Sequence, residues 1–176
     1  MQKESFGPLR FVIAVLVITC CIGCDQATKR LAKKTLDTGR VHSYLGDVIR
    51  LEYAVNPGGF LSLGSQLPSA YRWFFFVVFN TLVMLLVTGF LLARWNTQIA
   101  VFIAAAFILA GGIGNLIDRV TQQGMVTDFI NVGIGPLRSG IFNVADMAVL
   151  FGAIALVIFV NEESCRKYES SRKYEA

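Results

Sequence analysis

Long uncharged runs of apolar residues divide the chain into segments of membrane length. Residues 73–93 and 95–117 carry no charge over 21 and 23 positions, and residues 139–161 are interrupted only by Asp146. A helix needs about 20 apolar residues to cross the hydrocarbon core of a bilayer. The first run, residues 11–24, reaches that length only if it continues to residue 28. The pattern therefore predicts four spanning helices, at about residues 9–28, 73–93, 96–117 and 140–160.

The first run also has features of a removable secretory signal peptide. It follows a basic start, its apolar core is short, and small residues come after it. Because three further apolar runs follow in the same chain, we expect the first run to be a retained helix.

The one long polar segment, residues 29–72, contains a pattern typical of short strands. Residues 41–55 alternate loosely and are rich in β-branched and aromatic types, and a break at Gly46 and Asp47 predicts a hairpin. Residues 29–36 carry four basic side chains among apolar ones, which predicts an amphipathic turn at the lipid headgroups.

The hairpin is followed by a further turn and a third short strand. Residues 56–59, Asn-Pro-Gly-Gly, favour the turn, and residues 60–63 favour the strand. We therefore expect an all-α integral membrane fold of four transmembrane helices with a small extramembrane β-sheet between helices one and two, over about residues 39–66. We expect one domain, residues 1–176.

Four spans place both termini on the same side of the membrane. With the termini inside, seven basic residues are internal and nine are external, in external segments about twice as long. The density of basic residues therefore favours cytoplasmic termini, with the first and third loops outside.

Composition agrees with a membrane protein and excludes several other classes. Hydrophobic residues make up 55% of the chain and charged residues 16%, with a mean hydropathy of +0.58. The net charge is +4, but the basic residues are scattered, which argues against nucleic acid and for contact with anionic lipid. Four cysteines and one histidine form no disulfide framework and no zinc-ligand pattern, so we expect no metal and no cofactor.

Three aspartates stand out against this apolar background. Asp118, Asp128 and Asp146 are the only acidic residues between Glu52 and Glu162. Two of them repeat the arrangement Asn-x-x-Asp, which in a helix places the amide and the carboxylate on one face. An ionisable side chain at membrane depth costs free energy, and so it indicates a functional site.

Asp128 and Asp146 could form a catalytic pair. Asp146 comes six residues after Gly140, about 9 Å along the predicted fourth helix at 1.5 Å per residue. Asp128 could meet it if the preceding loop folds against the helix mouth. Two carboxylates in close contact do not readily both ionise, so one stays protonated. Such a pair can hydrolyse a peptide, because one carboxylate activates water while the other polarises the scissile carbonyl.

The residue pattern leaves other functions open. Asp118 could form an interfacial ion pair with Arg119, Asp128 could cap a turn, and Asp146 could be held by a neighbouring helix. The aspartates could instead form a proton or ion relay in a small transporter, since membrane carboxylates often do so. Asn115 and Asn143 could orient either a substrate backbone or the aspartates.

Four ordered motifs on the predicted frame of four spans narrow these possibilities. The motifs are Asp25-Gln-x-Thr-Lys29, Gly111-x-x-Gly114-Asn115-x-x-Asp118-Arg119, Val126-x-Asp128-Phe129 and Phe142-Asn143-x-Ala145-Asp146. Together they resemble the bacterial lipoprotein signal peptidase (signal peptidase II) family over almost the whole chain.

This resemblance implies an intramembrane aspartyl endopeptidase of the bacterial inner membrane. It would cut prolipoproteins just before a diacylglyceryl-modified cysteine, near the outer face, and we expect a monomer surrounded by membrane lipid. The extramembrane sheet would be the family's periplasmic cradle on the membrane surface. By motif, the catalytic pair is Asp128 and Asp146, and not Asp118. The supporting or substrate-binding residues would be Asp25, Lys29, Asn56, Gly58, Gly111, Asn115, Asp118, Arg119, Asn143 and Ala145.

One segment departs from the family pattern. The family's N-x-G-A-A-F stands here as Asn56-Pro-Gly58-Gly-Phe-Leu-Ser62, which displaces the aromatic residue. We therefore expect a different rim of the pocket, with an effect on substrate or inhibitor preference.

Overall fold

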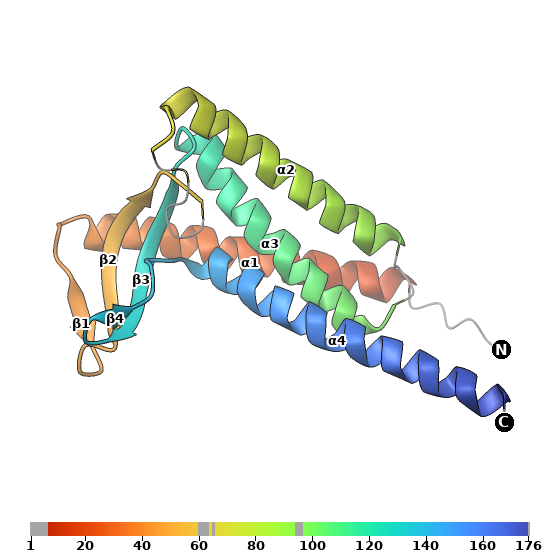
Figure 1. The fold of residues 1–176 in the computed structure, drawn as a ribbon. Helices are drawn as coiled ribbons and strands as arrows, with labels where there is room; N and C mark the ends of the chain where they lie inside the picture. Colours follow the sequence, from red (N-terminus) through yellow and green to blue (C-terminus); the bar gives the residue numbers. More distant parts are fainter. Residues whose placement is uncertain (1–6, 60–63, 65, 94–96, 176) are drawn as a thin grey trace.

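Four long helices and a small antiparallel sheet make up the fold (Figure 1). The structure is a computed structural model, which describes residues 7–59, 64, 66–93 and 97–175. The helices are α1 (Gly7–Leu36), α2 (Ser69–Ala93), α3 (Ile99–Thr121) and α4 (Val144–Glu175). All four are long and apolar enough to cross a membrane, which confirms the four helices expected from the sequence.

The third helix is the centre of the bundle. α3 packs against α1, α2 and α4, and its buried face consists largely of alanine and glycine. A side chain at Gly111 would collide with the backbone carbonyl of Ala145, and one at Gly112 would collide with Met84. These glycines therefore let the neighbouring helices approach α3 closely.

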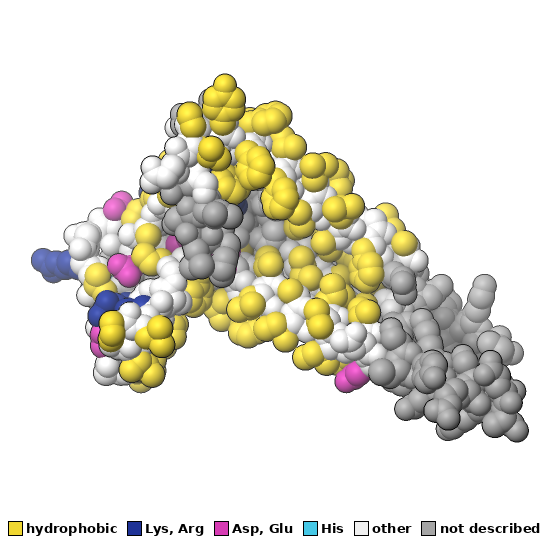
Figure 2. Space-filling view, viewed as in Figure 1, with side chains coloured by type: hydrophobic (Ala, Val, Ile, Leu, Met, Phe, Trp, Pro, Cys, Tyr) yellow, Lys and Arg dark blue, Asp and Glu magenta, His cyan; other side chains and the backbone are white. Residues whose placement is uncertain are grey.

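Apolar side chains cover the outward faces of the helices (Figure 2). On α2 the exposed residues include Phe74, Phe75, Phe79, Leu85 and Leu86. A surface of this kind is stable against lipid and not against water.

The helices have different limits from those predicted, and α2 begins four residues earlier, at Ser69. α1 continues without a break to Leu36, so the predicted interfacial turn at residues 29–36 is part of this helix. Its last turns bury Ala32 and Leu36 against Phe129 below the sheet. α3 extends past residue 117 to Thr121.

The start of the fourth helix was placed too early by the sequence. α4 begins at Val144, and not near residue 140, because residues 141–143 form an extended segment paired with the sheet. Phe142 exchanges backbone hydrogen bonds with Ile130. Asp146 therefore lies in the first turn of α4 and not about 9 Å inside it.

Among the described residues, the sheet has four strands in the order β1-β2-β3-β4. The predicted hairpin is present as β1 (His42–Tyr44) and β2 (Ile49–Asn56). However, β3 (Val126–Ile134) and β4 (Leu137–Arg138) follow α3, so the sheet is not built from the first loop alone. The third strand predicted at residues 60–63 lies outside the described residues.

A polar cluster fixes the register between the two hairpins. Asp47 lies at a positive φ of 73° in the β1–β2 turn and accepts hydrogen bonds from Arg50 and Ser43. These hydrogen bonds, Arg50 first, hold the pKa of Asp47 well below its ordinary value. Arg138 reaches across from β4 to the carbonyl of Asp47, at 2.7 Å, and to Asn131 on β3. The position of β3 beside β2 is therefore well defined.

The sheet and the chain ends lie at opposite ends of the bundle. α1 begins and α4 finishes at the same end, and all four strands lie at the other (Figure 1). Asp128 lies on β3, Asp118 near the end of α3 and Asp146 in the first turn of α4, and Asp25 of α1 bonds the N–H of Ala145 beside it, so all four aspartates lie toward the sheet.

Candidate active site

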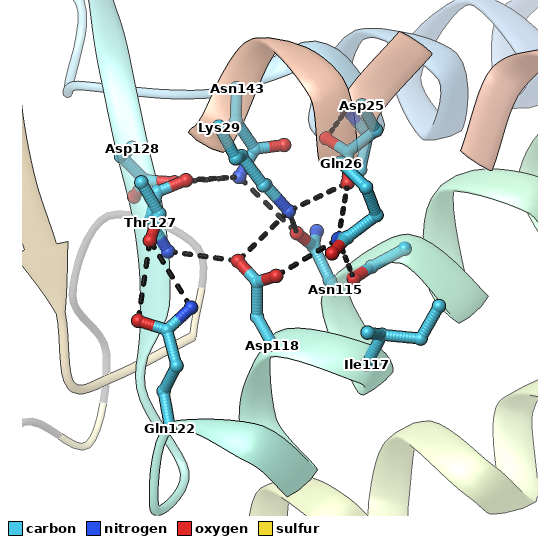
Figure 3. Close-up of polar contacts among 12 residues, drawn as sticks. Asp25, Gln26, Lys29, Asn115, Ile117, Asp118, Gln122, Thr127, Asp128 and Asn143 are labelled. Atoms are coloured by element: carbon cyan, nitrogen blue, oxygen red, sulfur yellow. Dashed lines mark hydrogen bonds and ion pairs between the residues drawn. The ribbon is translucent and has the colours of Figure 1, made fainter. Parts of the chain in front are cut away.

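A layer of buried polar side chains lies where the sheet meets the helix ends (Figure 3). Its members come from β2, β3 and three of the helices. Every site residue predicted from the sequence belongs to this layer or packs directly beside it.

Asp128 is held on β3 by two amide groups. The Asn56 side chain donates to Oδ2 of Asp128 at 3.0 Å, and Asn143 donates to Oδ1 at 2.6 Å. Asp128 is only 3% exposed. Burial, and then the negative charge of Asp146, raise the pKa of Asp128 to about 6.

Asp146 is held by a reciprocal cap at the start of α4. Its backbone N–H donates to the side-chain oxygen of Asn143 at 2.9 Å, and its Oδ2 accepts the backbone N–H of Asn143 at 3.1 Å. This is the geometry of a capping box, in which two residues three apart satisfy the free N–H groups of a helix start. The other oxygen, Oδ1, accepts a hydrogen bond from Asn115 at 2.8 Å.

Asn143 therefore connects the two carboxyl groups. Its side-chain NH2 faces Asp128, while its side-chain oxygen and backbone N–H face Asp146. Asn143 has no exposed surface, so packing on all sides fixes its orientation.

The layer contains a buried cation, the ammonium group of Lys29. The ammonium of Lys29 lies 2.9 Å from Asp25 and 3.1 Å from Asp118. Asp25 also accepts the backbone N–H of Ala145, which joins α1 to α4. Asp118 accepts the backbone N–H of Thr127, the residue before Asp128. The cluster thereby joins three helices and β3 around one charge.

The ion pair of Asp118 with Arg119, one alternative that the sequence left open, does not form. Asp118 pairs with Lys29, because adjacent residues on a helix point in different directions. Arg119 donates to the carbonyl of Gly58 at 3.2 Å and lies over the ring of Phe76, 5.4 Å from its centroid. Its Nε is buried and has no hydrogen-bond partner.

The remaining predicted residues act mainly through their backbones. The N–H of Gly58 donates to the side-chain oxygen of Asn56, which fixes the turn after β2. At Gly114 a Cβ would lie 2.7 Å from Asp25 Oδ2. Gly111 and Ala145 form the contact between α3 and α4 described above.

Sequence reasoning missed two members of the layer. Gln26 donates to Asp118 at 2.9 Å and to the carbonyl of Gly114 at 3.2 Å. Gln26 lies inside the motif Asp25-Gln-x-Thr-Lys29, so its role in the layer was predictable from the sequence. Thr127 acts through its backbone N–H and carbonyl, which no residue pattern reveals.

No metal site accompanies these side chains. Within the described ranges, no group of three or more His, Cys, Asp or Glu side chains is placed to hold a metal ion. The space between Asp25 and Asp118 is taken by the ammonium of Lys29.

Comparison with known proteins assigns this architecture to a family. The family described as "Signal peptidase (SPase) II" matches residues 17–161, most of the chain. The chain belongs to the signal peptidase II family. Signal peptidase II relatives named "Lipoprotein signal peptidase" include those of Hydrogenovibrio crunogenus, 37% identical over 90% of this chain and 88% of the relative, and of Desulforapulum autotrophicum, 35% identical over 82% and 89%.

Solved structures of bacterial membrane enzymes share this fold. A bacterial membrane enzyme determined at 2.3 Å covers 95% of this chain and 96% of its own, with a TM-score of 0.75 at 26% identity. A second, at 1.9 Å, has a TM-score of 0.68 over 90% of this chain at the same identity. The sequence resemblance to the signal peptidase II family is thus confirmed, and the chain is a multi-pass bacterial membrane protease.

Proposed function

We propose that this protein is an intramembrane aspartyl endopeptidase that removes the signal peptide from prolipoproteins, cutting before the diacylglyceryl-modified cysteine. The observation that carries the proposal is the pair of buried carboxyl groups, Asp128 and Asp146, oriented by the same asparagine. The relatives' name, lipoprotein signal peptidase, supports the substrate class.

The environments of the two carboxyl groups suggest how they divide the work. Asp128 has a pKa of about 6, so it is the group that more readily holds a proton. Asp146 would then be ionised and take a proton from water, whose oxygen attacks the scissile carbonyl carbon. Asp128 would give its proton to the carbonyl oxygen, which forms a tetrahedral gem-diol. When this intermediate collapses, Asp146 would give its proton to the amide nitrogen and a gem-diol hydroxyl would return a proton to Asp128, while the C–N bond breaks and the new amino terminus leaves.

The proton-relay alternative lacks a path through the bundle. From residue 11 to residue 24 of α1, 73 to 93 of α2, 99 to 117 of α3 and 147 to 161 of α4, the chain has no Asp, Glu, Lys, Arg or His. The ionisable side chains of the site come from the last turn of α3, from β3, from the first turn of α4 and from the part of α1 that contacts them. A relay across a membrane needs groups at intervals along its depth.

The direct test is cleavage by the purified protein in detergent. We expect it to cut a diacylglyceryl-modified prolipoprotein before the cysteine, to ignore the unlipidated form, and to keep its activity in excess chelator. Activity that disappears with chelator and returns with zinc would contradict the aspartyl mechanism. If the parent protein cleaves no substrate but conducts protons in liposomes, the relay is favoured instead.

The rate should fall on the alkaline side near pH 6. The pKa of Asp128 is raised in the fold, so the protonated form is favoured there. As the pH rises from about 4 through about 6, Asp128 loses its proton. Burial of the resulting carboxylate then costs increasing free energy of folding. The pH dependence of kcat/KM reports the ionisation of groups in the free enzyme. Its alkaline limb should therefore give the pKa of Asp128.

Asn56→Ala should move this limb to higher pH, because the hydrogen bond from Asn56 lowers the pKa of Asp128. Asn131→Ala is the matched control, since Asn131 is a buried asparagine of the same sheet that bonds Ser139 and Arg138. Rates measured across a pH series would contradict the assignment if Asn56→Ala left the limb unmoved.

We also propose that the termini are cytoplasmic and that the site lies near the outer face of the bacterial inner membrane. We also propose that the protein acts as a monomer. In a variant without native cysteines, Thr38→Cys should react with an impermeant thiol reagent in intact spheroplasts, because Thr38 is exposed at the sheet end. Gln98→Cys, at the opposite end, should not react. Labelling at residue 98 alone would invert the topology.

A further inference from the structure

Lys29 makes one contact that charge neutralisation does not explain. Besides its ion pairs with Asp25 and Asp118, its ammonium donates to the side-chain oxygen of Asn115 at 2.9 Å. Two carboxylates already compensate the single positive charge. The third contact is to the amide that bonds Asp146, and Figure 3 shows Lys29 beside Asn115.

This contact fixes which end of the Asn115 amide faces Asp146. An ammonium group can only donate, so the atom beside it must be the amide oxygen. The NH2 group of Asn115 must then point away from Lys29, and it donates to Oδ1 of Asp146 at 2.8 Å. One amide therefore separates the buried cation from the carboxylate.

Oδ1 of Asn115 also accepts a hydrogen bond from Asn143, the second asparagine of the site. The NH2 group of Asn143 lies 3.2 Å from Oδ1 of Asn115 and 2.6 Å from Asp128. Both asparagines thus turn N–H groups toward the carboxyl pair, and Lys29 provides the shorter and charged contact to the oxygen that they share.

We propose that Lys29 is a positioning residue for peptide hydrolysis, acting on Asp146 through the Asn115 amide. The inference rests on the proposed function. The hydrogen bond from Lys29 to the amide oxygen holds and polarises the group, which strengthens its N–H as a donor. Asp146 is thereby supported as a carboxylate without a direct ion pair, which would weaken it as a base for water.

The charge of Lys29 and its hydrogen bond can be separated by substitution. Lys29→Gln and Lys29→Met both remove the charge, but only the glutamine can still donate to Asn115. The charged groups that face Asp128 are Asp146 of α4, Lys29 of α1 and Arg119 of α3. Loss of the Lys29 charge raises the pKa of Asp128, so both variants should show the alkaline limb at higher pH.

The two variants should differ in kcat at the pH optimum. Lys29→Gln is expected to remain within about tenfold of the parent, and Lys29→Met to fall by about a hundredfold, with KM unchanged in both. Equal values of kcat for the two variants would overturn the inference, because the hydrogen bond to Asn115 would then have no effect on the chemical step.

A structural role for Lys29 is tested by a charge-balanced pair. Lys29→Met leaves Asp25 and Asp118 buried without a counter-charge, which should destabilise the fold. Adding Asp118→Asn restores the net charge of the cluster. The double variant should therefore regain much of the Tm that Lys29→Met loses but remain about a hundredfold below Asp118→Asn in kcat.

If the double variant recovers kcat together with Tm, Lys29 only stabilises the fold. That result would overturn the inference about Lys29 but not the proposed function. The proposed function has its own test in the two aspartates. If Asp128→Asn and Asp146→Asn are inactive while the double variant is active, the function stands and the role of Lys29 does not.

Discussion

Replacing Asp128 or Asp146 by asparagine should lower turnover about a thousandfold while leaving the protein folded. Asparagine has nearly the same volume, but it can neither take a proton from water nor protonate the carbonyl oxygen. Because each carboxyl group accepts hydrogen bonds from fixed amide donors, the new amide loses some of these contacts as well. The measurement is the cleavage rate of lipidated prolipoprotein, together with its binding and the Tm in detergent.

The losses at the two aspartates should not add. When two groups act as one unit, removal of the first already abolishes most of their joint effect on the rate. The cleavage rate of the Asp128/Asp146 double variant should therefore resemble those of the single variants. Asp37→Asn is the control, since Asp37 is exposed beyond the end of α1 and should leave the rate unchanged. If Asp128→Asn cleaves at near the parent rate, the catalytic pair has been wrongly assigned.

Gly111→Ala should destabilise the bundle by about 3 kcal/mol and reduce activity with it. The added methyl group would meet the carbonyl oxygen of Ala145 and lie 3.1 Å from the backbone N of Val149. Backbone atoms cannot rotate aside, so α3 and α4 must separate. Asn115 and Asp146 lie on those two helices, and their hydrogen bond is 2.8 Å long. Separation of the helices should therefore lower kcat as well as the Tm.

Gly89→Ala is the matched control for helix packing. Gly89 also lies within an apolar helix, α2, but a Cβ there would have no neighbour within 4 Å. Alanine favours the helix by about 0.8 kcal/mol over glycine, so this variant should be equally or more stable. A Gly111→Ala protein with parent Tm and rate would show that the close contact of α3 and α4 is not required.

The spanning helices were predictable because their signal is local. Each depends on a run of about 20 uncharged residues, and the cost of exposing charge to lipid makes that run sufficient evidence. The sheet was only half predictable. Its β1–β2 hairpin has a local turn signal, whereas β3 pairs with β2 across some 70 residues of intervening chain. No pattern within residues 126–134 identifies that partner.

The site was predictable in membership and not in geometry. The motifs named almost every residue of the polar layer, but Asn143-x-x-Asp146 was interpreted as a stack on one helix face. In the structure it is a helix cap, with Asn143 before the first turn. Likewise, the partner of Asp118 is Lys29, 89 positions away, and not its neighbour Arg119. Contacts between distant segments depend on the folded arrangement, which the sequence does not display directly.

The pairing of β2 with β3 has a consequence for synthesis of the protein in the cell. A ribosome finishes Asn56 about 70 residues before it reaches Val126, roughly 4 to 14 seconds at 5–20 residues per second. During that interval one edge of β2 has no strand to bind, and neither Asp128 nor Asp146 has been made. A nascent chain that stalls after α3 would therefore lack the proposed catalytic pair, yet it would present an open strand edge that quality-control factors could recognise.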